Sequence, residues 1–154
     1  MQYISTRGRA EAVDFTGALL AGLAPDGGLY VPQHVPVFSP ARWAELAKLS
    51  YSELAVEIML PFVEGCLNRA TLTPMVEGAY QTFRHAAIAP LTQIGRDHFV
   101  LELFHGPTLA FKDFALQLLG RLLEFALTSN GTGAMVLGAT SGDTGSAAMA
   151  ACIG

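Results

Sequence analysis

The chain has 154 residues, of which 51% are hydrophobic and 14% are charged, and its formal net charge at pH 7 is −4. A chain of this length corresponds to one domain or slightly more, with ample apolar material for a core. Its lysines and arginines form no cluster, which argues against a nucleic-acid or anionic-membrane partner. No apolar run approaches the roughly 20 residues that span a bilayer, so we expect no membrane segment.

The two cysteines, Cys66 and Cys152, are too few for a disulfide scaffold. They fit a reducing cytoplasm, where a free cysteine often packs as a small hydrophobic residue. The N-terminus lacks the basic and then apolar pattern of a secretory signal. We therefore expect a cytoplasmic protein.

Residues 1–88 predict a mostly helical domain that opens with a short strand over residues 2–5. The first helix is expected from the N-cap Asp14 to Gly22, because Asp before a helix and Gly after it are typical boundaries. The other expected elements are a turn over 25–28, an extended segment over 29–32, and helices that begin at Ser39-Pro40, at Ser50 with Glu53 at capping-box spacing, and at Thr73-Pro74. Nothing in these helices indicates catalysis.

The pattern changes near residue 89. Strands expected over 91–94, 98–104 and 134–139 alternate with helices expected over about 113–127 and from about Gly145. This alternation indicates a parallel sheet, so we predict an α/β fold with a helical domain over 1–88 and an α/β domain over 89–154. One or two parallel strands cannot bury both faces of a sheet, so we expect this second domain to be incomplete and the chain to be truncated.

The polar side chains of the helix predicted from residue 113 form one narrow stripe, at Asp113, Gln117, Arg121 and Glu124. The rest of this helix is apolar, so we expect it to be nearly surrounded by protein. Asp113 is also a residue type that the helix dipole favours in a first turn.

Lys112 is the most informative residue, because it is a lone cation in the apolar run from 103 to 114. A solvated lysine in the first turn of a helix is one interpretation. The neighbours Ala110-Phe111 and Phe114-Ala115 favour burial, which lowers the pKa of an amine. A neutral amine is a nucleophile that forms Schiff bases with carbonyl groups, including the aldehyde of pyridoxal phosphate.

The second informative run is Gly-Ala-Thr-Ser-Gly-Asp-Thr-Gly-Ser over residues 138–146. It is predicted to follow a strand and to open a helix, where backbone N–H groups and the helix dipole favour an anion. Ser141 and Thr144 add hydroxyl donors, and the small residues allow a ligand to approach the backbone. An ordinary strand-to-helix turn is the alternative interpretation.

Other kinds of site are not indicated. The chain lacks the Gly-x-Gly-x-x-Gly pattern and the Gly-Lys-Ser/Thr ending of a P-loop, which disfavours a nucleotide-binding domain. The histidines His34, His85, His98 and His105 form no i, i+4 pair with a carboxylate, so we expect no metal site. His105 is expected to order its own loop.

With these two runs identified, the sequence resembles the threonine synthases, which are fold-type II pyridoxal-phosphate enzymes. Residues 104–113 resemble the cofactor-lysine motif of that family, and residues 139–145 resemble its substrate loop. Residues 3–8 and 22–32 resemble its separate N-terminal domain. The four runs occur in the order that the family has, so the resemblance covers essentially the whole chain.

The resemblance implies the conversion of O-phospho-L-homoserine and water to L-threonine and phosphate. It implies that Lys112 binds pyridoxal 5'-phosphate and moves protons, with Phe111 beside the lysine and Asp143 near the ring hydroxyl of the cofactor. It further implies a set of residues for the substrate carboxylate: Ser141, Gly142, Thr144 and Gly145. The cradle for the cofactor phosphate and the partner of the pyridine nitrogen are expected after residue 154, so we expect the chain alone to be inactive.

Two alternatives remain open at this point. A threonine synthase-like phospholyase shares the lysine and the loop but eliminates phosphate without making threonine. A non-catalytic interaction module is the other alternative, although such a module needs neither an intact Lys112 nor an intact loop. The oligomeric state is not readable from the sequence.

Overall fold

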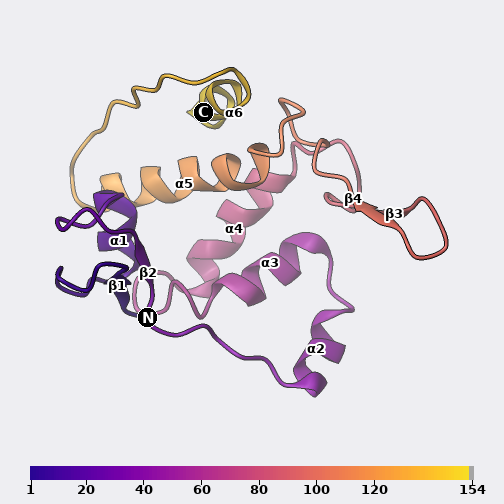
Figure 1. The fold of residues 1–154 in the computed structure, drawn as a ribbon, viewed down its shortest axis with the longest axis horizontal. Helices are drawn as coiled ribbons and strands as arrows, with labels where there is room; N and C mark the ends of the chain where they lie inside the picture. Colours follow the sequence, from indigo (N-terminus) through magenta and orange to yellow (C-terminus); the bar gives the residue numbers. More distant parts are fainter. Residues whose placement is uncertain (153–154) are drawn as a thin grey trace. The chain divides into compact units, whose positions relative to one another are not determined.

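The computed structural model describes residues 1–152, which form six helices and four short strands. The chain divides into two compact units, Met1–Pro74 and Met75–Gly154, and each contains one antiparallel pair of strands. The ribbon in Figure 1 shows that helices make up most of the regular structure in each unit. The predicted α/β class is confirmed, and the division into domains 1–88 and 89–154 stays a prediction.

The first unit combines a two-stranded sheet with short helices. Its elements are β1 (Tyr3–Ser5), α1 (Phe15–Ala21), β2 (Tyr30–Pro32), α2 (Pro40–Leu46), α3 (Tyr51–Met59) and the first half of α4 (Arg69–Tyr80). β1 pairs with β2 in antiparallel register, so that Tyr3 lies opposite Pro32. The strand, the extended segment and the three helices expected before residue 60 are therefore confirmed.

Side-chain caps explain where these helices begin. The Asp14 side chain accepts a hydrogen bond from the Gly17 N–H at the start of α1. Ser39 caps α2 in the same way, and Ser50 and Glu53 form a complete capping box at the start of α3. Each cap satisfies a backbone donor that has no partner inside the helix. Local sequence thus determines these three boundaries.

Helix α4 begins earlier than the sequence predicts. The expected start at Thr73-Pro74 is wrong, because the helix already begins at Arg69 and contains Pro74 in its interior. The Asn68 side chain accepts a hydrogen bond of 3.0 Å from the Thr71 N–H and so acts as the cap. The proline removes one backbone hydrogen bond from this helix but does not end it.

The core of the first unit is apolar and includes one buried tyrosine. The buried hydrophobic residues of this unit are Tyr3, Ala24, Leu46, Val56, Val63, Leu67 and Leu72. The Tyr3 hydroxyl donates a hydrogen bond of 2.9 Å to the Phe62 carbonyl oxygen, which satisfies its polar end. Burial raises the pKa of Tyr3 above its usual 10.0.

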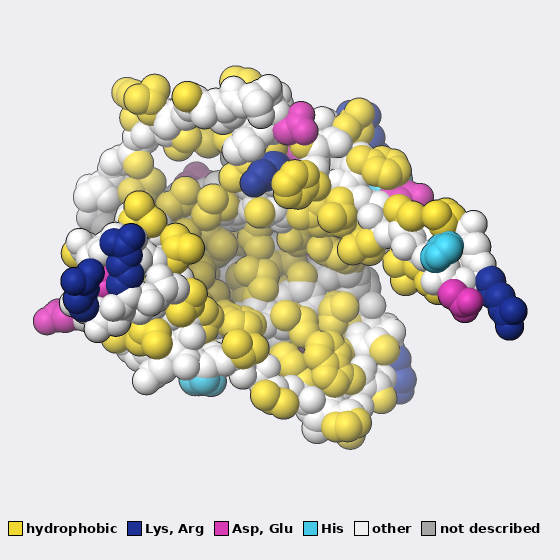
Figure 2. Space-filling view, in the orientation of Figure 1, with side chains coloured by type: hydrophobic (Ala, Val, Ile, Leu, Met, Phe, Trp, Pro, Cys, Tyr) yellow, Lys and Arg dark blue, Asp and Glu magenta, His cyan; other side chains and the backbone are white. Residues whose placement is uncertain are grey.

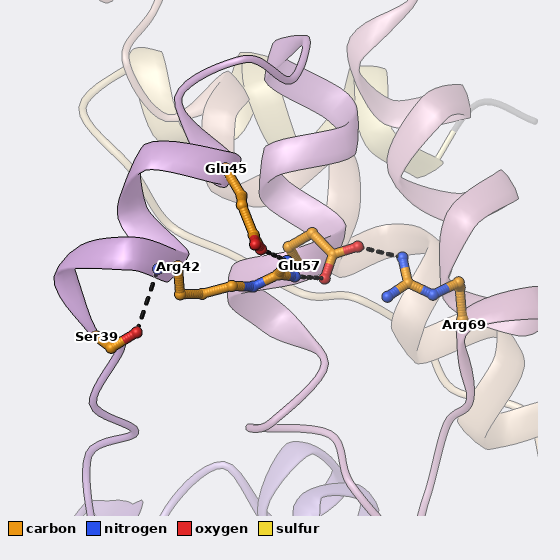
Figure 3. A network of polar contacts seen from close by, with 5 residues as sticks. All are labelled: Ser39, Arg42, Glu45, Glu57 and Arg69. Carbon is orange, nitrogen blue, oxygen red and sulfur yellow. Dashed lines mark hydrogen bonds and ion pairs between the residues drawn. The ribbon is translucent and has the colours of Figure 1, made fainter.

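Polar contacts connect the helices of the first unit (Figure 3). Arg42 of α2 donates to Glu57 of α3 at 2.6 Å and to Glu45 at 2.9 Å. Arg69, the first residue of α4, also donates to Glu57. The hydrogen bond from Arg69, followed by the charges of Arg69 and Arg42, holds the pKa of Glu57 below its usual 4.5. One carboxylate, 16% exposed, thus contacts two neighbouring helices.

Asp26 holds the turn before β2 against the end of β1. Its carboxylate accepts hydrogen bonds from the Ser5 hydroxyl at 2.7 Å, from the Gly28 N–H at 2.9 Å and from the Arg9 N–H at 3.0 Å. These bonds, with the Ser5 hydroxyl first, lower the pKa of Asp26 from its usual 3.8 to about 2. The ionised form of Asp26 therefore stabilises the folded unit.

The lower pKa of Asp26 in the folded protein predicts that stability depends on pH, and Asp26→Asn should remove this dependence. A carboxyl whose pKa falls on folding stabilises the protein above its unfolded-state pKa, and that contribution is lost as the pH falls through the folded-state pKa. Between about pH 4 and about pH 2, we expect the thermal midpoint of the wild type to fall more steeply than that of Asp26→Asn. Asp97→Asn, a change in the exposed hairpin turn, should keep the wild-type slope. Equal slopes for the wild type and Asp26→Asn would contradict the role of Asp26.

The second unit contains a strand hairpin and three helical segments. Its elements are the second half of α4, β3 (Leu91–Gln93), β4 (Phe99–Leu101), α5 (Asp113–Ser129) and α6 (Asp143–Cys152). Helices α4 and α5 contact each other where the Arg121 guanidinium donates a hydrogen bond of 2.9 Å to the Gly78 carbonyl oxygen. The rings of Phe83 and Phe114 meet edge to face with their centroids 4.9 Å apart.

Two polar side chains lie within the core of the second unit. The buried hydrophobic residues of this unit are Val76, Ala79, Tyr80, Phe83, Ile88, Ala110, Leu118, Leu122, Ala126 and Ala147. Asp113 and Gln117 are buried with them, whereas Glu124 is exposed. The polar stripe predicted on α5 therefore begins inside the core and reaches the surface farther along the helix.

The parallel sheet that the sequence predicts does not form among the described residues. β3 and β4 are antiparallel, and residues 134–139 are exposed but form no strand. A strand needs a neighbour that accepts and donates its backbone hydrogen bonds, and the described residues place none beside 134–139. The expected strand over 134–139 is therefore wrong for this structure.

Exposed hydrophobic side chains mark two segments of the second unit. Figure 2 shows yellow hydrophobic atoms at the surface of the β3–β4 hairpin, where Leu91, Ile94, Phe99, Val100 and Leu101 are exposed. In the segment before α6, Met135 is 91% exposed and Leu137 is 94% exposed. None of the described helices combines the length and apolar character of a membrane span.

Candidate functional site

Lys112 lies at the N-terminal boundary of α5, with helical backbone angles of φ −61° and ψ −22°. Its side chain is partly exposed, so Lys112 has neither the full burial that its apolar neighbours favour nor the exposure of a fully solvated lysine. The Nζ atom lies 5.1 Å from the centroid of the Phe111 ring, within the range of a cation–π contact. Phe111 is 57% exposed and Leu109 is 55% exposed, so apolar neighbours in the sequence do not cover the amine. Lys112 is therefore not enclosed by the described residues.

The loop before Lys112 is held by the residue that follows it. The Thr108 N–H donates to Asp113 Oδ2 at 2.9 Å, and the Thr108 hydroxyl donates to Asp113 Oδ1 at 2.9 Å. Leu109 has a φ of 63°, a left-handed conformation that a non-glycine residue adopts only under constraint. The shape of this loop therefore depends on the Asp113 carboxylate.

His105 orders the first part of the same loop, as predicted. Its Nε2 atom lies 2.7 Å from Glu102 Oε2, and its carbonyl oxygen accepts a hydrogen bond of 2.8 Å from the Arg84 N–H. The hydrogen bonds from His105 and then from the Thr92 hydroxyl hold the pKa of Glu102 below its usual 4.5. Both ends of the lysine loop are thus tied to the body of the second unit.

The residues expected to bind substrate lie together in the loop that leads into α6. Ser141, Gly142 and Asp143 are exposed, whereas Thr144 and Gly145 are partly exposed. Asp143 is the first residue of α6, two residues before the helix start that the sequence predicts.

Thr140 sets the shape of this loop. Its hydroxyl oxygen accepts hydrogen bonds from the Gly142 N–H at 3.2 Å and from the Gly145 N–H at 3.0 Å. Gly142 has a φ of 138°, which side chains rarely allow, and no atom lies within 4 Å of the position of a Cβ there. The loop is therefore open above Gly142, at a helix N-terminus where backbone N–H groups favour an anion.

Helices α5 and α6 pack against each other and so bring their preceding loops into one structure. The Gln117 amide donates to the Ala147 carbonyl oxygen at 3.3 Å, and a Cβ on Gly120 would lie 2.7 Å from the Ala151 carbonyl oxygen. At a rise of 1.5 Å per residue, Lys112 lies about 7.5 Å along α5 from Gln117, and Asp143 lies about 6 Å along α6 from Ala147. Each loop therefore joins its helix within about a turn and a half of the contact between Gln117 and Ala147.

Sequence reasoning misses three residues of this arrangement. Thr108 and Thr140 are absent from the predicted site, although the side chain of a Thr ahead of a helix commonly forms local hydrogen bonds. Gln117 is predicted only as part of a polar stripe, although its i, i+4 spacing from Asp113 indicates that the two side chains meet.

The arrangement allows two chemical interactions. The amine of a partly exposed lysine can attack an aldehyde, and an open loop with hydroxyl groups at a helix N-terminus can bind a carboxylate. These are the interactions that a lysine linked to pyridoxal phosphate and a loop for an amino-acid substrate need. The described residues therefore fit the lysine and substrate parts of such a site.

Comparisons with known proteins all indicate threonine synthases. The family model described as "Threonine synthase N terminus" matches residues 2–80. The chain is 55% identical to threonine synthase of Pseudomonas aeruginosa, over 99% of this chain and 32% of the relative. It is 39% identical to "Threonine synthase-like 2" of Homo sapiens, over 97% of this chain and 31% of the relative. The chain thus spans about a third of the length of the curated relatives that it matches.

Solved structures of threonine synthases have the same fold over this span. The PLP-bound threonine synthase from Brucella melitensis matches with a TM-score of 0.96 and 52% identity, over 98% of this chain and 32% of that chain. Threonine synthase from yeast matches with a TM-score of 0.89 and 39% identity, over 97% of this chain and 32% of that chain. The match of the family model over more than half of the residues, together with these similarities, shows that the chain belongs to the threonine synthase N-terminus family.

Proposed function

We propose that the complete gene product containing these residues is a threonine synthase. It converts O-phospho-L-homoserine and water to L-threonine and phosphate, with pyridoxal 5'-phosphate as cofactor. The observation that carries the proposal is that the partly exposed Lys112 lies on the same packed helix pair as the open loop over 140–145. The 55% identity to threonine synthase of Pseudomonas aeruginosa, over 99% of this chain, supports it.

Lys112 is the residue that binds the cofactor and moves protons at the substrate Cα and Cβ. Bound pyridoxal phosphate supplies an electron sink for the bond that is broken at Cα. Phe111 lies beside the amine and provides an apolar surface for the cofactor. Asp143, at the exposed start of α6, lies near the ring hydroxyl of the cofactor in this proposal.

The loop before α6 binds the substrate carboxylate through the residues that the sequence predicts, Ser141, Gly142, Thr144 and Gly145. The Gly142 and Gly145 N–H groups donate to Thr140, so in this proposal the two glycines give the loop its shape and the hydroxyl groups of Ser141 and Thr144 are the donors offered to the carboxylate. The net reaction is balanced: the C–O bond at Cγ breaks and releases phosphate, Cβ loses one proton and Cγ gains one to become the methyl group, and water supplies the hydroxyl group at Cβ and a proton to the released phosphate.

The proposal is tested by the identity of the product. The complete protein, supplied with pyridoxal phosphate and O-phospho-L-homoserine, is expected to release phosphate and L-threonine in equal amounts, measured by a phosphate assay and by chromatography. Absence of both products would contradict the proposal. We expect no phosphate release from the 154-residue chain on its own, because it spans only about a third of its relatives.

A phospholyase is the second candidate function. It is favoured by the 40% identity to "Threonine synthase-like 2" of Xenopus laevis over 97% of this chain. Phosphate release without L-threonine in the same assay would support this candidate. The presence of Lys112 and of the complete loop over 140–145 argues against a purely structural module.

A further inference from the structure

Buried and partly buried polar contacts connect the two functional loops inside the second unit. Thr108, in the loop that carries Lys112, donates two hydrogen bonds to the Asp113 carboxylate. Asp113 also accepts a hydrogen bond of 3.3 Å from Gln117 Nε2, and the same nitrogen donates at 3.3 Å to the Ala147 carbonyl oxygen of α6. Thr108, Asp113, Gln117 and Ala147 are termed the buried clamp below.

Burial makes the contacts of the buried clamp difficult to replace. Asp113 and Ala147 are 0% exposed, and Gln117 is 8% exposed. A polar group that loses its partner at such a site is not compensated by water, so each broken contact leaves an unsatisfied atom. In the part of the chain that the structure describes, no buried side-chain nitrogen or oxygen lacks a hydrogen-bond partner.

The chemistry of Gln117 is specific to its place between the two helices. Both of its partners, the Asp113 carboxylate and the Ala147 carbonyl, are acceptors. A side chain that contacts both must therefore supply two hydrogen atoms, which the amide NH₂ group does. Glutamate at this position has only acceptors when ionised, and methionine has nearly the same length but no donor.

The lysine loop is shaped to approach the same carboxylate closely. A Cβ on Gly106 would lie 2.4 Å from Asp113 Cβ and 2.4 Å from Asp113 Oδ2, so only glycine fits at this position. The left-handed Leu109 lies in the turn that follows. A loop with this strain keeps its shape only while its anchor remains in place.

We propose that the buried clamp fixes the glycine-rich loop before α6 relative to the Lys112 loop, with Gln117 as its central positioning residue. The proposal rests on the function proposed above, because both loops then act on one substrate. Gln117 contacts neither substrate nor cofactor in this proposal and acts through α6 and Asp113. Since a displacement of about 1 Å at reacting groups can reduce a rate about 100-fold, loss of the amide should affect turnover more than folding.

Gln117→Met in the complete protein is the direct test. We expect kcat to fall by about 10- to 100-fold. We also expect faster amide hydrogen exchange, measured by mass spectrometry, in residues 105–112 and 139–146, while the rest of α5 keeps its wild-type protection. Gln81→Met is the matched control, because it makes the same change at an exposed position of the same unit. The control should leave both kcat and exchange unchanged.

A second variant keeps the test decisive if Gln117→Met does not fold. Thr108→Val preserves the shape of the side chain but removes the hydroxyl that donates to Asp113. We expect faster exchange over residues 105–112 and slower trapping of pyridoxal phosphate on Lys112 by borohydride. Gln117→Glu should raise the exchange over residues 139–146 more than Gln117→Met does, because it places a second carboxylate beside Asp113.

The outcomes separate this proposal from the proposed function. If the wild-type protein makes no threonine, the proposed function fails, and hydrogen exchange still measures whether Gln117 fixes both loops. Wild-type exchange in both loops of Gln117→Met, or an equal rise of exchange throughout the second unit, would overturn the positioning role. A selective rise in the two loops together with a lower kcat would establish it.

Discussion

Replacement of Lys112 by alanine in the complete protein is expected to reduce threonine formation by at least about 10³-fold, because proton transfer by a placed side chain contributes roughly 10²–10⁴-fold and covalent binding is lost as well. The visible absorbance of the lysine-linked cofactor should disappear at the same time. Borohydride reduction followed by peptide mass spectrometry should then find no cofactor on this segment. The absorbance and the labelling are readouts that do not depend on turnover.

The sequence offers a matched control for this experiment. Lys48 is the only other lysine in the chain, and it is exposed after α2 in the first unit. Lys48→Ala should keep the wild-type activity, absorbance and labelling, whereas Lys112→Arg, which keeps the charge, should behave like Lys112→Ala. If Lys112→Ala retained the absorbance band, the cofactor lysine would have to be assigned elsewhere.

Gly106→Ala is expected to have the second largest effect. The added Cβ would lie 2.4 Å from both Cβ and Oδ2 of Asp113, closer than real atoms allow, so either the loop or the helix start must move. Overpacking of this kind usually costs about 1–3 kcal/mol of stability. Because Asp113 anchors the loop that carries Lys112, trapping of pyridoxal phosphate on the lysine should slow as well. The urea midpoint and the rate of borohydride trapping measure these two effects.

A glycine in open space provides the comparison for Gly106. At Gly133 no atom lies within 4 Å of the Cβ position, so Gly133→Ala should leave the urea midpoint unchanged or raise it slightly through the unfolded state. If Gly106→Ala and Gly133→Ala had the same midpoint and trapping rate, close packing against Asp113 would not explain the glycine at 106. A lower midpoint with normal trapping would restrict the role of Gly106 to stability.

Much of this fold can be predicted from the sequence, because interactions between residues close in the chain determine it. The caps at Asp14, Ser39 and Ser50 satisfy backbone donors within the next three residues, so the boundaries of α1, α2 and α3 follow from neighbouring residues alone. At α4, two local signals compete. The helix begins after Asn68 and not at Thr73-Pro74, because the earlier start adds backbone hydrogen bonds to the helix. The internal proline removes only one of them.

The candidate site is readable in part. The residues of each run, the apolar one around Lys112 and the small ones over 140–145, are adjacent in sequence, so their types alone indicate an amine and an anion loop. The exposure of Lys112 is not readable, because the side chains that cover a residue come from elsewhere in the fold. The same holds for 134–139, where β-strand composition is present but no described strand lies beside it.

The sequence by itself determined the helix caps, the positions of the strands near 91–93 and 99–101 and the residues available for chemistry, since these depend on interactions within a few residues. Only the tertiary structure decided that Asp113 and Gln117 face inward and connect the Lys112 loop to α6. A polar stripe on a helix has the same sequence pattern whether it faces water or a buried carbonyl. Its direction is set by what packs against it, and here the partner, Ala147, lies 30 residues from Gln117.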